Sequence, residues 1–312
     1  MHFLFILDPL DSLKPHKDTS LAIMHEAARR GHQLSMAEQG GLMLRDGLVG
    51  IQARDFEFAA DSWHTGDATL VAPEIFDAVL MRKDPPFDME YIYSTYLLEL
   101  AEQQGARVFN RPRSIRDFNE KLSVAQFAEF APPFLVTRQM ALIREFLDEY
   151  GDIVVKPLDG MGGSGIFRLH REDANVGVIL ETITHFERRT VMAQRYLPAI
   201  KQGDKRILLI DGELVPYALA RIPKPGETRG NLAAGGTGVA QPLSARDHEI
   251  AAALGPRLKE MGLFLVGLDV IGDYLTEINV TSPTCMVEIA EQTDCNPAML
   301  FVDALERACC AS

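Results

Sequence analysis

The feature that most restricts the fold of this chain is a glycine-rich loop between two strand-like segments, residues 152–170 (DIVVKPLDGMGGSGIFRLH). Gly160, Gly162 and Gly165 satisfy the spacing GxGxxG, which in a dinucleotide-binding fold requires a helix to begin at the third glycine. The residues that follow, IFRLH, instead alternate apolar and polar side chains as a strand does. A Walker P-loop is also excluded, because no Lys-Ser or Lys-Thr follows the glycines. The segment therefore predicts a strand, a flexible glycine loop and a second strand.

A glycine loop of this kind suits a phosphate group. The backbone N–H groups of residues such as Gly160, Gly162 and Gly163 can approach an anion closely, because no side chain intervenes. Lys156, on the strand before the loop, would add a positive charge. The alternative is a mobile surface hairpin without a ligand, and this segment alone does not decide between the two.

Size and charge narrow the class of protein. The chain has 312 residues, of which 47% are hydrophobic and 24% charged, so it can form two or three packed units. Apolar runs such as residues 262–268 are far shorter than the roughly 20 residues of a membrane span. A net charge of −13 without a basic block argues against a nucleic-acid or membrane surface. We therefore expect a cytoplasmic protein with neither kind of partner.

Strand and helix signals alternate over the first part of the chain. Short apolar runs predict strands at 2–7, 75–81 and 106–110. Helical patterns lie between them, at residues 18–30 and 89–104. Such alternation indicates a mostly parallel sheet with helices on its faces, so we expect an N-terminal α/β domain.

From about residue 134 the pattern becomes that of antiparallel strands. Hairpin turns are predicted at Asp211-Gly212 and Gly272-Asp273, each between two apolar runs. Helical patterns interleave with these strands at 139–150, 174–184, 244–261 and 297–308. The second part of the chain is therefore expected to be an α+β domain.

Two carboxylates and an amide are predicted to share one face of a hairpin at residues 264–280 (FLVGLDVIGDYLTEINV). Strand alternation places Glu277 and Asn279 on the same face. If the turn has an odd number of residues, Asp269 lies opposite Glu277 and every apolar residue faces one core, whereas an even turn mixes the faces. Carboxylates opposite each other repel, so we expect a divalent cation such as Mg²⁺, which takes oxygen ligands and keeps substrate phosphates in its shell. The alternative is an exposed polar face.

A long connection, residues 222–238 (IPKPGETRGNLAAGGTG), contains two prolines, five glycines and Arg229. A structureless loop of this length in a compact domain is usually functional or disordered, and its glycines suit a lid. Arg206 and Arg221 lie on the strands before it, and Arg82 ends a strand in MRKDPPFD. In an acidic chain these arginines are candidate anion-binding groups, although each alone could equally be a surface charge.

Taken together, these segments resemble the bacterial-type glutathione synthetases of the ATP-grasp superfamily. The strings that match in order and spacing are MRKDPPFD (81–88), NEKL (119–122), KPLDGMGG (156–163), AQRYLPAIKQGDKR (193–206), ARIPKPGETRGNLAAGG (220–236) and GLDVIGDYLTEINVTSP (267–283). The match covers nearly the whole chain, and the lid and metal strings are more specific than any isolated glycine motif.

The resemblance implies an ATP-dependent ligase that joins γ-glutamylcysteine and glycine through an acyl phosphate, releasing glutathione, ADP and phosphate. It implies a substrate-binding domain at residues 1–120 and an ATP-grasp catalytic domain at 121–312, with a smaller lid subdomain at about 134–200 and flexible lid loops. ATP would be the co-substrate and Mg²⁺ the metal, with Mn²⁺ as the alternative. A homo-oligomer, either a dimer or a tetramer, is also implied.

The same resemblance assigns roles to individual residues. The implied ATP-binding residues are Lys121, Lys156, Gly160, Gly162 and Gly163 at the phosphates, Gln194, Arg195, Tyr196 and Leu197 at adenine, and Asp204 at the ribose. The implied metal ligands are Asp269, Glu277 and Asn279. The implied catalytic residues are Arg206, Arg221 and Arg229. The implied substrate-binding residues are Arg82, Arg206, Arg221 and Asn279.

One position departs from the family pattern. Thr237 stands where an arginine is expected within the last glycines of the lid, so lid closure would depend on Arg229. Two alternatives to the implied function remain. Another ATP-grasp ligase, joining a different acid and amine, would share the glycine loop and the metal face but need not share MRKDPPFD or the lid string. A non-catalytic ATP-binding protein could lose Glu277 or Asn279, and the presence of both favours turnover.

Overall fold

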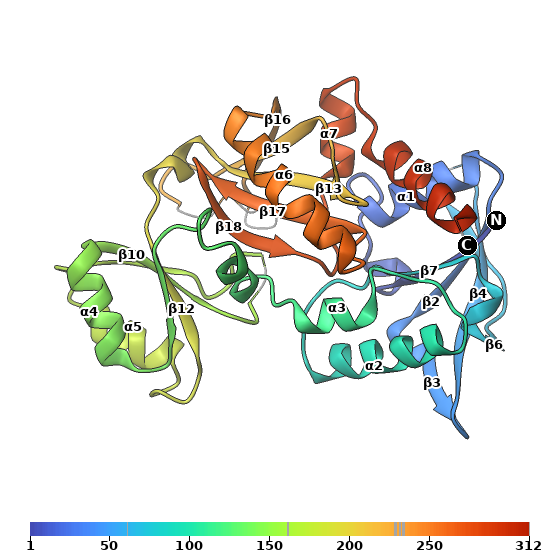
Figure 1. Cartoon of the computed structure of the whole chain (residues 1–312), viewed down its shortest axis with the longest axis horizontal. Helices are drawn as coiled ribbons and strands as arrows, with labels where there is room; N and C mark the ends of the chain where they lie inside the picture. The colour runs from blue at the N-terminus through green and yellow to red at the C-terminus, as the bar shows by residue number, and fades with distance from the viewer. Residues whose placement is uncertain (61, 161, 228–229, 231, 233–234, 312) are drawn as a thin grey trace.

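The computed structural model describes residues 1–312 except 61, 161, 228–229, 231, 233–234 and 312. Its N-terminal sheet is parallel at its centre, as predicted (Figure 1). Strand β1 (His2–Leu7) runs parallel to β2 (Gln33–Glu38) and to β7 (Ala78–Met81), and β7 runs parallel to β8 (Val108–Phe109). The edge beyond β2 was not predicted, and its strands are all antiparallel to their neighbours: β3 (Leu42–Arg45), β4 (Leu48–Phe58), β5 (Trp63–Thr65) and β6 (Thr69–Val71).

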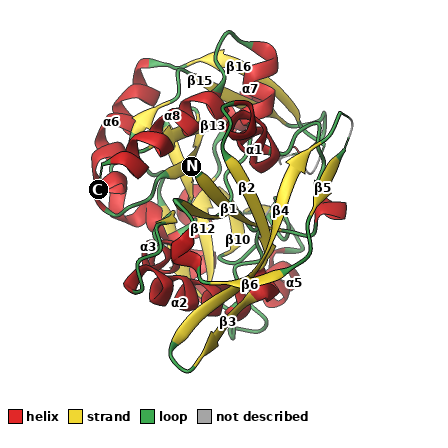
Figure 2. Ribbon diagram, turned by 90° about the vertical axis from the view of Figure 1, so that its right-hand side faces the viewer, coloured by secondary structure: helices red, strands yellow, loops and turns green. Residues whose placement is uncertain are grey.

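The two faces of β1 pack against different helices. Phe3, Phe5 and Leu7 belong to one core with α1 (Thr19–Arg29) and α8 (Pro297–Cys310). Leu4 and Ile6 belong to another core with α2 (Met89–Gln103). This alternation is the period of two that a strand covered on both faces requires. Both predicted helices are present, and α3 (Pro112–Asp117) follows β8. The C-terminal helix α8 therefore returns to the N-terminal layer (Figure 2).

The second sheet carries the glycine loop. It has four antiparallel strands in the order β11 (Phe167–His170), β10 (Asp152–Pro157), β12 (Val191–Arg195) and β9 (Phe134–Thr137). Helices α4 (Met140–Tyr150) and α5 (Val176–Ile183) share one apolar core with this sheet. The glycine loop connects β10 to β11, so a strand follows the glycines, and the exclusion of a dinucleotide-binding fingerprint is confirmed.

The third sheet lies between the other two (Figure 1). Its strands, all antiparallel, follow the order β16 (Thr237–Pro242), β15 (Tyr217–Ile222), β13 (Asp204–Ile210), β17 (Leu265–Ile271) and β18 (Tyr274–Asn279), with β14 (Glu213–Leu214) beside β13. Helix α6 (Ala245–Glu260) packs on one face, and α7 (Met286–Gln292) and α8 share a core with the other. Short 3₁₀ helices occupy Leu10–Ser12, Gln39–Gly41, Pro73–Ile75, Leu122–Phe127 and Pro198–Gln202.

The hairpin of β17 and β18 has the predicted cross-strand pair but not the predicted turn. Asp269 lies opposite Glu277, as expected from the odd register. The turn nevertheless contains two residues, Gly272 and Asp273, so the prediction of an odd-length turn was wrong. A β-bulge reconciles the two registers: Thr276 is the extra residue, and its hydroxyl donates to the Asp269 carbonyl oxygen (3.1 Å).

The bulge keeps the apolar side chains of the hairpin on one face. Leu268 pairs with Ile278 before the shift, and Val270 pairs with Leu275 after it. All four side chains lie in the core beneath α6. An even turn without a bulge would have mixed the two faces of the hairpin. The sequence pattern therefore correctly required a change of register, but the prediction located that change in the turn, whereas the structure has it in the strand.

The long connection before β16 is shorter than predicted. Ile222 pairs with Thr237 and Arg221 pairs with Gly238. The ends of the predicted loop at 222–238 therefore belong to strands, because β15 ends at Ile222 and β16 begins at Thr237. Strand β16 escaped prediction because its sequence, TGVAQP, carries little apolar alternation. Among the helices of the described residues, none is both long and apolar enough to cross a membrane.

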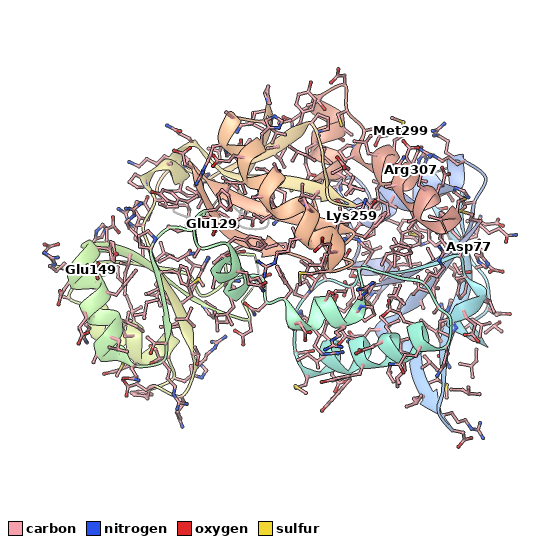
Figure 3. All side chains as sticks on the ribbon, in the orientation of Figure 1. Asp77, Glu129, Glu149, Lys259, Met299 and Arg307 are labelled. Carbon is pink, nitrogen blue, oxygen red and sulfur yellow. The ribbon has the colours of Figure 1, made fainter. Side chains whose placement is uncertain are left out.

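An ion-pair network joins α1 to α8. Glu26, which is 5% exposed, accepts hydrogen bonds from Arg29 (2.8 Å) and Arg30 (2.7 Å). Arg30 also pairs with Asp303 of α8 (2.6 Å). The hydrogen bond from Arg29 is the main reason that the pKa of Glu26 falls from 4.5 to about 2. In Figure 3, Met299 and Arg307 of α8 project from the outer surface, and Asp303 lies one helical turn from each of them, so the network reaches the exposed face of that helix.

We expect Glu26→Gln to lower the free energy of unfolding by about 1 to 3 kcal/mol at pH 7, because two guanidinium groups lose their charged acceptor. Since the folded-state pKa is depressed, the stabilisation is complete above pH 4.5 and is lost as the pH falls toward 2. Urea denaturation at pH 7 measures the first effect, and a series from pH 6 down to about pH 2 measures the second. The exposed Glu38→Gln serves as the control, and an equal loss in both variants would contradict a role for the network.

Candidate active site

A cavity of about 520 Å³ is lined by residues of all three sheets. The residues predicted from the sequence that line it are Arg82, Lys121, Lys156, Gly160, Gly162, Gly163, Gln194, Tyr196, Leu197, Asp204, Arg206, Arg221, Asp269, Glu277 and Asn279. Arg195 is not among them: its guanidinium lies over the Tyr274 ring, 5.3 Å from the centroid. Arg229 lies outside the described residues. The cavity therefore brings together most of the predicted site residues, which are spread between Arg82 and Asn279 in the sequence.

The carboxylate of Asp269 is held by two arginines. Arg206 lies opposite it across β13 and β17, with Nε 2.6 Å from Oδ1. Arg221 places its Nη2 2.9 Å from Oδ2. Asp269 is only 3% exposed, and burial alone would raise its pKa. The two guanidinium groups outweigh burial and hold the pKa of Asp269 well below its usual range, so the carboxylate is ionised.

Asp204 is the second carboxylate of this cluster. It lies opposite Arg221 across β13 and β15 and pairs with the Arg221 guanidinium. Burial nevertheless raises the pKa of Asp204 to about 7, with Asp269 contributing in the same direction. Among the described residues, its Oδ1 atom has no hydrogen-bond partner. A buried acceptor without a partner costs free energy, which a hydroxyl-bearing ligand could recover.

Two lysines from different segments converge on Glu277. The Lys156 ammonium, from β10, lies 3.2 Å from Glu277 Oε1, and the Lys121 ammonium lies 3.8 Å from the same atom. Lys121 also donates to the carbonyl of Gly160 (2.7 Å) at the start of the glycine loop. Burial would raise the pKa of Glu277, but the two ammonium groups lower it further than burial raises it. In the free protein the two lysines therefore share a carboxylate, and their binding to the phosphates of ATP remains a prediction.

Asn119 and Glu120 position Lys121, and neither was singled out from the sequence. The side-chain oxygen of Asn119 accepts from the Lys121 backbone N–H (3.0 Å), and its amide donates to the Leu158 carbonyl (3.0 Å). The backbone carbonyl of Glu120 accepts from Ile278 of β18 (2.8 Å). Its carboxylate also contacts the Lys121 ammonium. Both residues lie within the string NEKL, which contributed to the family resemblance. No local sequence pattern, however, indicated that Asn119 and Glu120 position the lysine.

The glycine loop has the conformation that only glycine adopts easily. Gly162 and Gly163 have φ values of 62° and 81°. A Cβ atom at Gly160 would come within 2.7 Å of the Pro157 ring. Glycine is therefore strongly favoured at these positions, and all three glycines line the cavity.

The far side of β12 contributes polar and aromatic groups. Gln194 is 5% exposed, and its Nε2 has no hydrogen-bond partner among the described residues. The Tyr196 ring is covered by the Arg168 guanidinium, 3.5 Å from its centroid. An unpartnered amide and a fixed aromatic ring beside a cavity suit a planar, hydrogen-bonding ligand.

Arg82 enters the cavity from the N-terminal domain. It is 5% exposed, donates from Nε to the Ser20 hydroxyl (3.1 Å) and from Nη2 to the Pro283 carbonyl (2.9 Å). No acidic side chain of the described residues lies within ion-pairing distance of it. Burial lowers the pKa of Arg82, and a buried cation held by neutral acceptors favours an anionic ligand.

The oxygen atoms of Asp269, Glu277 and Asn279 fit a hard divalent cation only in part. The Asn279 amide nitrogen donates to the Gly267 carbonyl (3.2 Å), which leaves its oxygen as the available donor. Within the part of the chain that the structure describes, no three His, Cys, Asp or Glu side chains are grouped as metal ligands. Mg²⁺ in phosphate-transfer sites typically takes one or two carboxylates and completes its shell with substrate phosphates and water. The residues therefore fit a metal that arrives with a nucleotide.

Two protein families together match most of the chain. The family described as "Prokaryotic glutathione synthetase, N-terminal domain" matches residues 1–116, and "Prokaryotic glutathione synthetase, ATP-grasp domain" matches residues 120–294. A glutathione synthetase of Nitrosomonas europaea is 62% identical, with 98% of each chain covered. A glutathione synthetase of Ralstonia nicotianae is 58% identical over 99% of this chain and 96% of the relative.

Solved structures with little sequence similarity share the fold. The crystal structure of D-cycloserine synthetase DcsG superimposes with a TM-score of 0.69 at 16% identity, covering 98% of this chain and 99% of the other. The ATP-grasp ligase PsnB, solved with a minimal precursor, Mg and ADP, gives a TM-score of 0.62 at 17% identity and covers 98% of both chains. At this level of identity the likeness shows the fold alone.

The arginine pair around Asp269 predicts a large stability effect. We expect Asp269→Asn to lower the free energy of unfolding by about 3 to 5 kcal/mol, because two buried guanidinium groups would lose their shared counter-charge. Chemical denaturation followed by circular dichroism measures the change. Asp273→Asn, in the exposed turn of the same hairpin, is the matched control. Equal stability of the two variants would show that Asp269 does not hold the arginines in place.

Proposed function

The chain belongs to the prokaryotic glutathione synthetases, ATP-dependent ligases of γ-glutamylcysteine and glycine, and on that premise we propose how its cavity divides the reaction among its residues. The observation that carries the proposal is that four acids lining the cavity, Glu120, Asp204, Asp269 and Glu277, are each paired with a lysine or arginine. Both signs of charge are thus available to a ligand that itself carries both, such as a nucleotide with its metal.

The chemistry requires activation of a carboxylate. Oxide is a poor leaving group, so the cysteine carboxylate of γ-glutamylcysteine first accepts the terminal phosphoryl group of ATP, and the amine of glycine then attacks the acyl phosphate. Two anions must approach each other in the first step. Lys121, Lys156 and the glycine-loop N–H groups are proposed to bind the phosphates and offset that repulsion.

Glu277 and the two lysines are proposed to exchange partners when nucleotide binds. In the free protein the ammonium of Lys156 pairs with Glu277 (3.2 Å). Phosphate oxygens would take the lysines, which frees the Glu277 carboxylate to act with Asp269 and Asn279 as metal ligands. Mg²⁺, or Mn²⁺ in its place, would neutralise phosphate charge and polarise the transferred group when bound there. The pairing with lysines thus keeps the acid ionised before its ligand arrives.

The arginines are proposed to act on the reacting carboxylate. Arg206 and Arg221 are oriented by Asp269, and their remaining N–H groups are suited to the acyl phosphate and to the tetrahedral oxyanion that glycine's attack creates. Removal of one such preorganised donor typically costs about 3 to 4 kcal/mol of transition-state stabilisation. We propose that Arg229 closes the lid over the intermediate and limits its hydrolysis by water.

Other residues that line the cavity are proposed to bind the nucleoside part of ATP. Gln194, Tyr196 and Leu197 are proposed to bind adenine, and Asp204, with its unpartnered oxygen, the ribose. Arg195 is proposed to contribute only its backbone, because its side chain lies over Tyr274. We further propose that residues 1–120 form a substrate-binding domain and residues 121–312 the catalytic domain, with a lid subdomain at about 134–200. We also propose that the protein is cytoplasmic and assembles into a dimer or tetramer.

The test is ADP release with ATP, Mg²⁺ and γ-glutamylcysteine, with and without glycine. We expect sustained ADP release only with all substrates. Lys156→Ala and Glu277→Gln should each lower kcat/KM about 100-fold or more, because each removes a charge that acts on the transferred phosphoryl group. Lys201→Ala, an exposed lysine, is the matched control. Faster turnover with another acid, such as N-acetylcysteine, would indicate a different carboxylate–amine ligase, and unchanged rates in both variants would reject the proposed site.

A further inference from the structure

Gly267 is a buried residue of β17 to which the proposed function assigns no role. It is not one of the residues that line the cavity. Its cross-strand neighbours are Leu208 of β13 and Asn279 of β18. Asp269 follows two residues later on the same strand, so strand alternation places both positions on one face of the sheet. A side chain at Gly267 would therefore project from the face that carries Asp269.

The space that such a side chain would fill is occupied by Arg206 and Pro283. A Cβ atom at Gly267 would lie 2.9 Å from Arg206 Cδ and 3.1 Å from Arg206 Nε. It would also lie 2.9 Å from Pro283 Cβ. Non-bonded carbon atoms normally stay about 3.5 to 4.0 Å apart. A methyl group at this position would therefore force Arg206, Pro283 or both to move.

The Arg206 side chain has little freedom to give way. It is 6% exposed, and it donates to Asp269 from Nε (2.6 Å) and from Nη2 (3.1 Å). Two such hydrogen bonds fix the plane of a guanidinium group. Among the described residues Nη1 has no acceptor, so it is available to a ligand in the cavity that Arg206 lines. Because Nε belongs both to the ion pair and to the contact with Gly267, displacing it would also displace the guanidinium.

Pro283 offers a second route by which a side chain at Gly267 could act. Its carbonyl accepts a hydrogen bond from Arg82 Nη2 (2.9 Å). A displaced Pro283 would therefore disturb Arg82, a candidate anion-binding residue, and not the pair of Arg206 with Asp269. The two routes predict different effects, because the first changes the placement of a group that acts on the reacting carboxylate and the second changes substrate binding.

We propose that Gly267 is a positioning residue, and that its lack of a side chain leaves the space in which Arg206 lies and so sets the direction of the Arg206 guanidinium. This inference rests on the proposed function, in which Arg206 stabilises the acyl phosphate and the tetrahedral oxyanion, and deepens it. A donor of this kind stabilises the transition state only when it is preorganised. An error of about 1 Å in its placement can lower the rate about 100-fold.

The test is Gly267→Ala, which adds one methyl group. Gly267 lacks the left-handed φ that would strain an alanine, so the contact with its neighbours is the main change. We expect kcat for glutathione formation to fall about 10- to 100-fold. The affinity for ADP alone, measured by calorimetric titration without Mg²⁺, should stay within about threefold of the parent at one site per chain. This second readout also shows that the variant is folded.

Gly40→Ala is the matched control. Gly40 is exposed and lacks a left-handed φ, and a Cβ atom there would meet no atom within 4 Å. The same substitution without the contact should leave kcat within about twofold of the parent. A loss in Gly267→Ala that Gly40→Ala does not share is then due to the position of the methyl group.

A double-mutant cycle identifies the residue through which Gly267 acts. Arg206→Ala removes Cδ and Nε, so in that background the methyl group at residue 267 has no guanidinium to displace. We expect Gly267→Ala to change kcat by less than about threefold there, with rates expressed per ADP-binding site. A full 10- to 100-fold loss in the Arg206→Ala background would overturn the proposal. A rise confined to KM for γ-glutamylcysteine in the single variant would also overturn it, because the methyl group would then act through Pro283.

The outcomes separate this inference from the proposed function. If Arg206→Ala keeps the parental kcat, the proposed function is wrong about Arg206, and the role of Gly267 falls with it. If Arg206→Ala is slow but Gly267→Ala matches Gly40→Ala, only the positioning role is overturned. Equal losses of kcat and of ADP-binding sites in Gly267→Ala would overturn it too, because the methyl group would then unfold the protein instead of displacing Arg206.

Discussion

The site depends on the pairing of buried charges, above all on Asp269 between Arg206 and Arg221. Each of these side chains is at least nine-tenths buried, so a charge left there without its counter-charge would be strongly destabilising. Because the three lie on neighbouring strands of the third sheet, the pairing also fixes how β13, β15 and β17 present their side chains to the cavity. On the neighbouring strand β18, Glu277 likewise lies between two cations, the ammonium groups of Lys121 and Lys156.

The fold supplies this pairing through a local irregularity. The two-residue turn at Gly272 sets one register, and the bulge at Thr276 restores the other before the strands reach Asp269. The bulge also bears directly on the site, because the Thr276 carbonyl accepts from the Lys156 ammonium (3.3 Å). A regular hairpin with the same turn would place Asp269 opposite a different residue, and the two carboxylates would no longer lie side by side.

The sequence predicts those parts of the fold and site that depend on local pattern. The alternation in residues 264–280 was enough to pair Asp269 with Glu277, but not to choose between an odd turn and a bulge, because both preserve the apolar face. The partners of Asp269 could not be predicted, since Arg206 and Arg221 reach it only through strand pairing across distant segments.

Partner exchange would make the carboxylates of Glu277 and Asp269 available to a metal only after the nucleotide phosphates have bound the lysines. If lysines and arginines neutralise Glu277 and Asp269 in the free protein, a divalent cation gains little by binding there without phosphates. Calorimetric titration of Mg²⁺ into the free protein and into the ADP-saturated protein, with ADP alone as the reference, tests this directly. We expect weak binding to the free protein and binding at least about tenfold tighter when ADP occupies the lysines. Equally tight Mg²⁺ binding in both states would contradict partner exchange.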